Sequence, residues 1–131
     1  YQFKLPAAPY VAKENTIIDI EFLKEKKKYL EQFCDLLIIE GAGGLMVPIE
    51  KDLFIIDLIK IFEASAILIA PSKLGCINDT ILSVNALKEK NIDFELFINL
   101  YQDIESFEKV SKPFLIDYFK KLNFLEDLEN L

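Results

Sequence analysis

The chain has 131 residues, of which 52% are hydrophobic and 28% charged, with a formal net charge of −7 at pH 7. The length suits one domain with a buried core, and the apolar content excludes a disordered chain. The acidic balance argues against nucleic acid as a partner, because a phosphate backbone is bound by Lys and Arg. No apolar run reaches the ~20 residues that span a bilayer. No signal peptide opens the sequence either, so we expect a cytoplasmic protein with no membrane partner.

The sequence contains no histidine and two cysteines. The absence of histidine excludes histidine-based triads and most catalytic zinc sites. Cys34 and Cys76 are too few and too far apart for a metal knuckle, so we expect free thiols in a reducing compartment.

Apolar and polar residues alternate in a way that predicts helices and strands in turn. The elements expected, in chain order, are an extended stretch at 6–9, an amphipathic helix over 19–33, a buried strand over 36–39, an extended segment at 47–49, a turn at 51–52, a helix over 54–62, a buried strand over 66–70, a helix over 78–90, a strand over 94–98, an irregular segment over 101–111 and a helix over 113–122. This order predicts a single α/β domain over 1–131, with a mostly parallel sheet covered by helices on both faces.

Three predicted strands are few for a sheet of this kind. Tyr1 is not an initiator residue. We therefore expect part of the sheet to lie upstream of the sequence shown.

The segment from Ile38 to Gly44 carries the strongest functional signal, since a predicted strand leads into Glu40 and then three glycines within four positions. In open α/β sheets, ligands bind at the carboxyl ends of the strands. Glycines let the backbone approach a phosphate without a Cβ in the way, and Mg²⁺ takes one or two carboxylates plus phosphate oxygens. Nucleotide chemistry is the functional hypothesis, and a strand-terminal acid that caps the next turn is the structural alternative.

A second candidate site is the loop and helix start around Gly75, which follows the predicted strand over 66–70. A helix start offers free N–H groups to a carboxylate or phosphate. The structural alternative is an ordinary helix capped by Ser72 or Asn78, with Lys73 a surface lysine and Cys76 packed as a small hydrophobe.

Polar residues follow each of the three predicted strands, at Glu40, over 72–78 and at Asn99. In a parallel sheet they would share one edge, although Asn99 could also be a turn asparagine.

These motifs resemble the dethiobiotin synthetase family over about residues 5–100. The resemblance is carried by Glu40-Gly41-Ala42-Gly43-Gly44 with Val47-Pro48-Ile49, by Lys73-Leu74-Gly75-Cys76-Ile77-Asn78, and by the Ala8-Pro9 stretch. It implies a P-loop NTPase-like three-layer α/β sandwich that works as a cytoplasmic homodimer. The reaction it implies closes the cyclic urea of dethiobiotin from 7,8-diaminononanoate, CO₂ or bicarbonate, and ATP, with Mg²⁺.

The resemblance also assigns roles to residues. It makes Glu40 the magnesium ligand, and places ATP against Glu40, Gly41, Ala42, Gly43, Asn99 and Leu100. The substrate carboxylate would be bound by Gly75, Cys76, Ile77 and Asn78, supplied by the partner subunit.

The family's phosphate-binding loop, G-x-x-x-x-G-K-S/T, does not occur in this sequence, nor do the catalytic lysine and the further aspartate that follow it. The sequence is most similar to the C-terminal two-thirds of such an enzyme. We therefore expect no catalytic residue among those shown and no turnover by them alone. Two alternatives remain: a partition-type P-loop ATPase module that dimerises with nucleotide, and a cobyrinate-type amidating synthetase.

Overall fold

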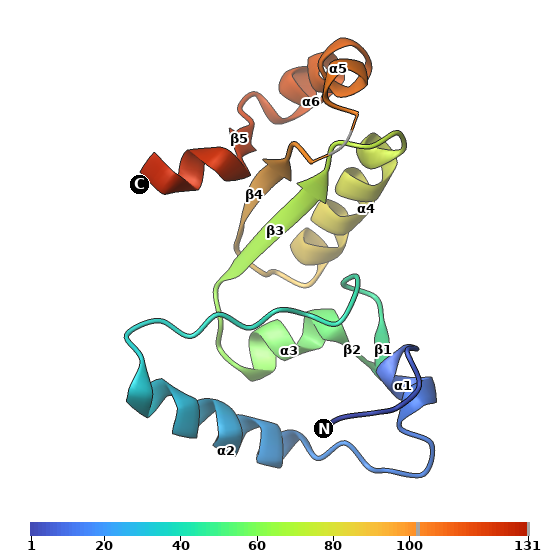
Figure 1. The fold of residues 1–131 in the computed structure, drawn as a ribbon, viewed down its shortest axis with the longest axis vertical. Coiled ribbons are helices and arrows are strands. Elements are labelled where there is room, and N and C mark those ends of the chain that lie inside the picture. Colours follow the sequence, from blue (N-terminus) through green and yellow to red (C-terminus); the bar gives the residue numbers. More distant parts are fainter. Residues whose placement is uncertain (102, 131) are drawn as a thin grey trace. The chain divides into compact units, whose positions relative to one another are not determined.

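The computed structural model describes residues 1–101 and 103–130, with side chains as far as residue 128. The chain divides into two compact units, Tyr1–Ala64 and Ser65–Leu131 (Figure 1). The single domain expected over 1–131 stays a prediction.

The first unit combines short helices with a small hairpin. Its elements are α1 (Pro9–Ala12), α2 (Ile20–Leu30), the 3-10 turn η1 (Glu31–Phe33), β1 (Pro48–Glu50), β2 (Leu53–Phe54) and α3 (Ile55–Ile61). Strands β1 and β2 pair antiparallel across the turn predicted at 51–52, and α1 packs against β1. The buried residues here are Ala12, Ile18, Ile49 and Ile56.

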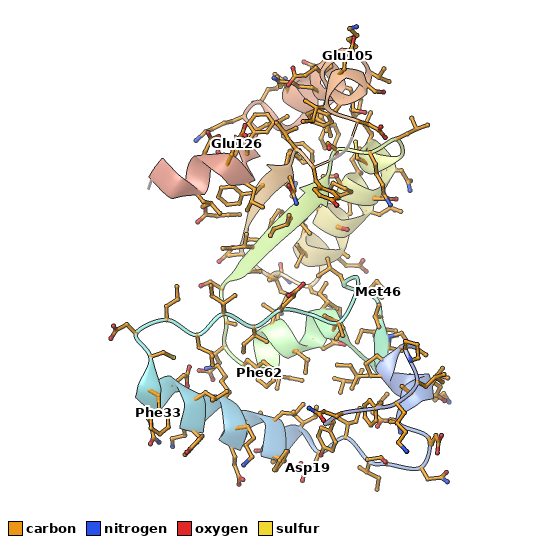
Figure 2. All side chains as sticks on the ribbon, viewed as in Figure 1. Asp19, Phe33, Met46, Phe62, Glu105 and Glu126 are labelled. Carbon is orange, nitrogen blue, oxygen red and sulfur yellow. The ribbon has the colours of Figure 1, made fainter. Side chains whose placement is uncertain are left out.

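Helix α2 forms where the sequence predicts it, because Asp19 caps it: its carboxylate accepts hydrogen bonds from the N–H groups of Glu21 at 2.9 Å and Phe22 at 3.3 Å. None of its residues is buried. Figure 2 labels Asp19 before the helix and Phe33 after it, where the Phe33 side chain is 70% exposed. The helix is confirmed, while its apolar positions do not pack into a core within this unit.

The strand predicted over 36–39 is wrong for the described structure. These residues pair with no strand, and the side chains of Leu36 and Ile38 are 76% and 82% exposed. A strand is stabilised by its ladder of hydrogen bonds to a neighbour, and the described part of this unit offers none to this segment. Glu40 therefore does not end a strand.

The second unit contains the parallel sheet. Its elements are β3 (Ala66–Pro71), α4 (Cys76–Glu89), β4 (Phe94–Asn99), α5 (Ile104–Ser106), the π-helical turn η2 (Phe107–Ser111), α6 (Lys112–Phe119), β5 (Asn123–Phe124) and the 3-10 turn η3 (Leu125–Asn130). The strand order is β3-β4-β5, with both pairs parallel (Figure 1). This result confirms the predicted α/β class with a parallel sheet.

The core of this unit is a cluster of buried side chains from the sheet and the helices: Ala70, Cys76, Ile98, Phe107 and Leu115. Helix α4 packs against β3. On β3 the exposure alternates, so that Ile67 and Ile69 are 58% and 51% exposed while Ala70 is buried. The strand predicted as buried is therefore covered on one face only within this unit.

Within the segment predicted as irregular over 101–111, residues 104–111 are helical, which the sequence did not indicate, and residue 102 lies outside the described residues. Phe107 and Ser111 are buried, and this packing orders the segment in spite of its polar composition. The turn over Phe107–Ser111 is π-helical and comes just before Pro113, which has no N–H to donate to the preceding turn. Strand β5 was also not predicted, since two residues are too few to show a period.

Candidate functional site

The glycine turn that follows Glu40 folds back onto the start of α3. The Ile55 N–H donates to the Val47 carbonyl at 3.0 Å, and the Ile56 N–H donates to the Leu45 carbonyl at 2.9 Å. These two amides lie at the start of a helix, where no carbonyl one turn earlier can accept from them. The turn thus supplies the acceptors that α3 needs.

Each glycine of the turn has its own structural setting. Gly43 has a φ of +88°, a left-handed conformation that favours glycine. Gly41 has no room for a side chain, because a Cβ built there would lie 2.8 Å from Cγ2 of Ile55. A Cβ on Gly44 would meet nothing within 4 Å. The local structure therefore explains why positions 41 and 43 hold glycine, and it gives no reason for glycine at position 44.

The Glu40 side chain is exposed, and within the described part of the chain it has no hydrogen bond or ion pair. The same residues contain no group of three or more His, Cys, Asp or Glu that could hold a metal ion. A single unpaired carboxylate still suits Mg²⁺, which completes its six ligands with phosphate oxygens and water. The donor set fits a magnesium nucleotide and does not fit a cage made of protein ligands.

In the second unit, two of the predicted site segments meet at one edge of the sheet. Pro71 and Asn99 are register partners at the ends of β3 and β4, so the segments that begin at Ser72 and at Leu100 leave the sheet from neighbouring points. Leu100 packs against the core cluster. Glu40 belongs to the first unit, and its place at this edge stays a prediction.

The start of α4 is shaped by Gly75, whose φ of +94° makes it the left-handed residue before the helix. The Cys76 N–H donates to the Lys73 carbonyl at 3.0 Å, and its side chain is fully buried in the core. Cys76 therefore acts as a small hydrophobe, and its amide is already used. The amides of Ile77 and Asn78 are first-turn donors that no described backbone hydrogen bond uses.

A pocket of about 490 Å³ opens beside this helix start. Its lining joins residues of the predicted substrate site with apolar residues from α4 and the π-helical turn: Leu74, Gly75, Ile77, Asn78, Ile81, Leu82, Val110 and Ser111. The helix start offers N–H donors and the rest of the wall is mostly apolar. This combination suits a molecule with a carboxylate at one end and an alkyl chain behind it.

Sequence reasoning found three of these lining residues, Gly75, Ile77 and Asn78, and missed the others. Ile77 and Ile81 lie four residues apart on a helix, so their spacing could have placed Ile81 on the same face. Val110 and Ser111 come from the segment predicted as irregular, and no local signal places them beside α4. The tertiary fold supplies that wall.

Across the described residues, no helix combines the length and the apolar character that crossing a bilayer requires.

Comparison with known proteins gives a consistent result. Residues 1–130 match a family described as AAA domain. The chain is 54% identical over 114 positions to a protein of Sulfurovum sp. (strain NBC37-1) and 38% identical over 134 positions to one of Wolinella succinogenes. It is 35% identical over 140 aligned positions to a protein of Methanocaldococcus jannaschii. Each of the three is named ATP-dependent dethiobiotin synthetase BioD.

These alignments take in 87%, 99% and 96% of this chain and 54%, 62% and 65% of the three relatives. The chain thus spans between about half and two thirds of the length of the curated relatives that it matches.

Proposed function

This chain belongs to the AAA domain family, and we propose that its protein is an ATP-dependent dethiobiotin synthase, a ligase of biotin biosynthesis. One amine of 7,8-diaminononanoate adds to CO₂ as a carbamate, and the terminal phosphoryl group of ATP is transferred to a carbamate oxygen. The second amine then attacks the carbamate carbon and displaces phosphate, which closes the cyclic urea. The names of the three relatives support this reaction and support neither the partition-type ATPase nor the cobyrinate-type amidating synthetase.

The observation that carries the proposal is the pocket at the start of α4. The substrate is a nine-carbon chain with a carboxylate at one end and two amines at the other. The amides of Ile77 and Asn78 would bind the carboxylate, with the positive end of the helix dipole behind them. Ile81, Leu82 and Val110 would cover the alkyl chain. Binding the unreactive end in this way orients the amines for the reaction.

Glu40 would hold Mg²⁺ together with phosphate oxygens of ATP. Its exposed and unpaired carboxylate supports this role. The ion, when bound, would stabilise the negative charge that develops on the transferred phosphoryl group.

The backbone of Gly41, Ala42 and Gly43 would form the wall beside the nucleotide. Asn99 and Leu100, at the carboxyl end of β4, would lie near the adenine. For Gly41 and Gly43 this role is added to the structural reasons that already favour glycine there.

We further propose that the protein acts in the cytoplasm as a homodimer, in which the pocket beside α4 of one subunit serves the nucleotide site of its partner. Neither nucleic acid nor a membrane is part of this proposal. The residues described do not supply a phosphate-binding loop, so turnover belongs to the full-length protein.

The proposal is tested by assaying the purified full-length protein with MgATP and bicarbonate, with and without 7,8-diaminononanoate. We expect ADP release to depend on the diamine and to be matched by a product with the mass of dethiobiotin. ATP turnover that ignores the diamine and responds to a protein partner would overturn the proposal in favour of a partition-type ATPase. Turnover that requires glutamine or ammonia would favour an amidating synthetase.

A further inference from the structure

Gly41 lies beside Ile55 although 14 positions separate them in the chain. A methyl group added at Gly41 would lie 2.8 Å from Cγ2 of Ile55, closer than carbon atoms approach one another. Cγ2 is attached directly to Cβ, so rotation about χ1 alone moves it, and χ1 of a β-branched residue is stiff. Cγ2 of Ile55 therefore has little freedom to move away from a methyl group added at Gly41.

The backbone of Ile55 is also held. Its N–H donates to the Val47 carbonyl at 3.0 Å, and Val47 in turn donates to the Gly44 carbonyl at 3.1 Å. The Phe54 N–H just before it donates to the Asp57 carboxylate at 2.8 Å. Hydrogen bonds from the N–H groups of Phe54 and Ile55 thus hold the start of α3, where the Ile55 methyl group lies beside Gly41.

We propose that Ile55 is a positioning residue for Glu40. The inference rests on the proposed function, because it assigns to Ile55 the task of holding the carboxylate that would bind Mg²⁺. Glu40 is exposed and has no partner of its own among the described residues, so only the backbone can hold it in place. Gly41 is the next residue along that backbone, and the Ile55 methyl group beside it would limit the direction in which the chain enters the turn.

The test measures divalent-metal affinity in the full-length protein with Mn²⁺ as the probe for Mg²⁺, by titrating Mn²⁺ in the presence of a non-hydrolysable ATP analogue and following the free ion by electron paramagnetic resonance, with the analogue alone as the blank. Ile55→Ala removes the Cγ2 methyl group, and we expect it to weaken metal binding about tenfold. Ile55→Val keeps that methyl group and loses only Cδ1, and we expect its metal affinity to stay within about threefold of that of the native protein. Equal affinities for the two variants would overturn the proposal.

A double substitution tests the contact itself. Gly41→Ala should weaken metal binding about tenfold by pushing the turn away from Ile55, and Gly41→Ala combined with Ile55→Ala should recover most of the loss, because the new methyl group takes the place of the one removed. Gly44→Ala is the matched control and should leave affinity unchanged, since its Cβ would meet nothing. An unaffected Gly41→Ala, or a double variant with no recovery, would overturn the positioning role.

Glu40→Gln in the same titration separates this inference from the proposed function. If Glu40→Gln leaves metal affinity unchanged, the magnesium assignment fails and the positioning role fails with it. If Glu40→Gln weakens binding while the Ile55 variants do not differ, only the positioning role fails. The melting temperature of every variant shows whether a lost affinity reflects unfolding, because a purely structural role would lower melting temperature and leave the affinity of the folded fraction unchanged.

Discussion

Pro71 and Asn99 are register partners in the parallel ladder of β3 and β4. Their pairing places the loop that leads to α4 beside the residues that follow β4. The candidate carboxylate pocket and the candidate adenine contacts therefore start from one edge of the sheet, where open α/β folds bind their ligands.

Replacing Glu40 with Gln should lower kcat of the full-length enzyme by about 100-fold or more while changing the affinity for the diamine little, because a lost metal ligand acts on phosphoryl transfer and the diamine carboxylate binds elsewhere. Steady-state kinetics at saturating and limiting diamine separates the two effects. Asp35→Asn is the control, since it removes another exposed acid of the same unit. Native turnover in the Glu40 variant would contradict the metal role.

Placing a negative charge in the α4 pocket should weaken substrate binding. Leu82 is 60% exposed and lines the pocket, so Leu82→Glu would repel the substrate carboxylate and raise KM for the diamine about tenfold, with less effect at high salt.

Two controls accompany the Leu82 variant. Leu82→Gln introduces polarity without charge, and Asn85→Glu adds the same charge at an exposed position of α4 outside the pocket lining. If all three variants raised KM equally, repulsion within the pocket would not be the cause.

The Thr80 hydroxyl should contribute nothing to stability. Thr80 is 1% exposed, and its Oγ1 has no hydrogen-bond partner among the described residues. A buried hydroxyl without a partner costs free energy, so Thr80→Val should leave the free energy of unfolding unchanged or raise it by about 1 kcal/mol. Urea denaturation measures the difference. Thr80→Ala, which also removes the hydroxyl but leaves a void, should be less stable than Thr80→Val, and a clear loss in the valine variant would reveal a partner for the hydroxyl.

The ion pair between Lys13 and Glu50 should stabilise the first unit. Nζ and Oε1 lie 3.0 Å apart, and the Lys13 side chain is only 12% exposed. We expect Lys13→Met to lower the free energy of unfolding by about 1 kcal/mol, because Glu50 loses its counter-charge, although its side chain is 34% exposed and water partly screens it.

A double-mutant cycle with Glu50→Gln isolates the energy of that pair. The control is Lys120→Met. In the native protein, Nζ of Lys120 lies 3.4 Å from Oδ1 of Asp117, and the two side chains are 80% and 89% exposed. We expect this variant to lower the free energy of unfolding by less than about 0.5 kcal/mol. Equal losses at the two sites would show that burial of the Lys13 pair adds nothing.

The elements that could be predicted are those whose signal is local. β3 and β4 come from short, mostly apolar runs that end at Pro71 and Asn99, α4 lies between them, and the structure places all three within two residues of the expected bounds. The loop through Gly75 was expected to lead into this helix, and the structure adds the reason for the glycine, a left-handed conformation just before α4.

The sequence by itself therefore determined the bounds of β3, α4 and β4 to within two residues and, through their alternation, the α/β class with a parallel sheet, since each of these elements depends on residues near one another along the chain. Only the tertiary structure decided that residues 36–39 have no strand partner among the described residues, that Val110 and Ser111 line the α4 pocket, and that Gly41 is glycine because of Ile55. Each of these depends on what lies beside a residue in space, and a short apolar run or a lone glycine carries no record of its distant neighbours.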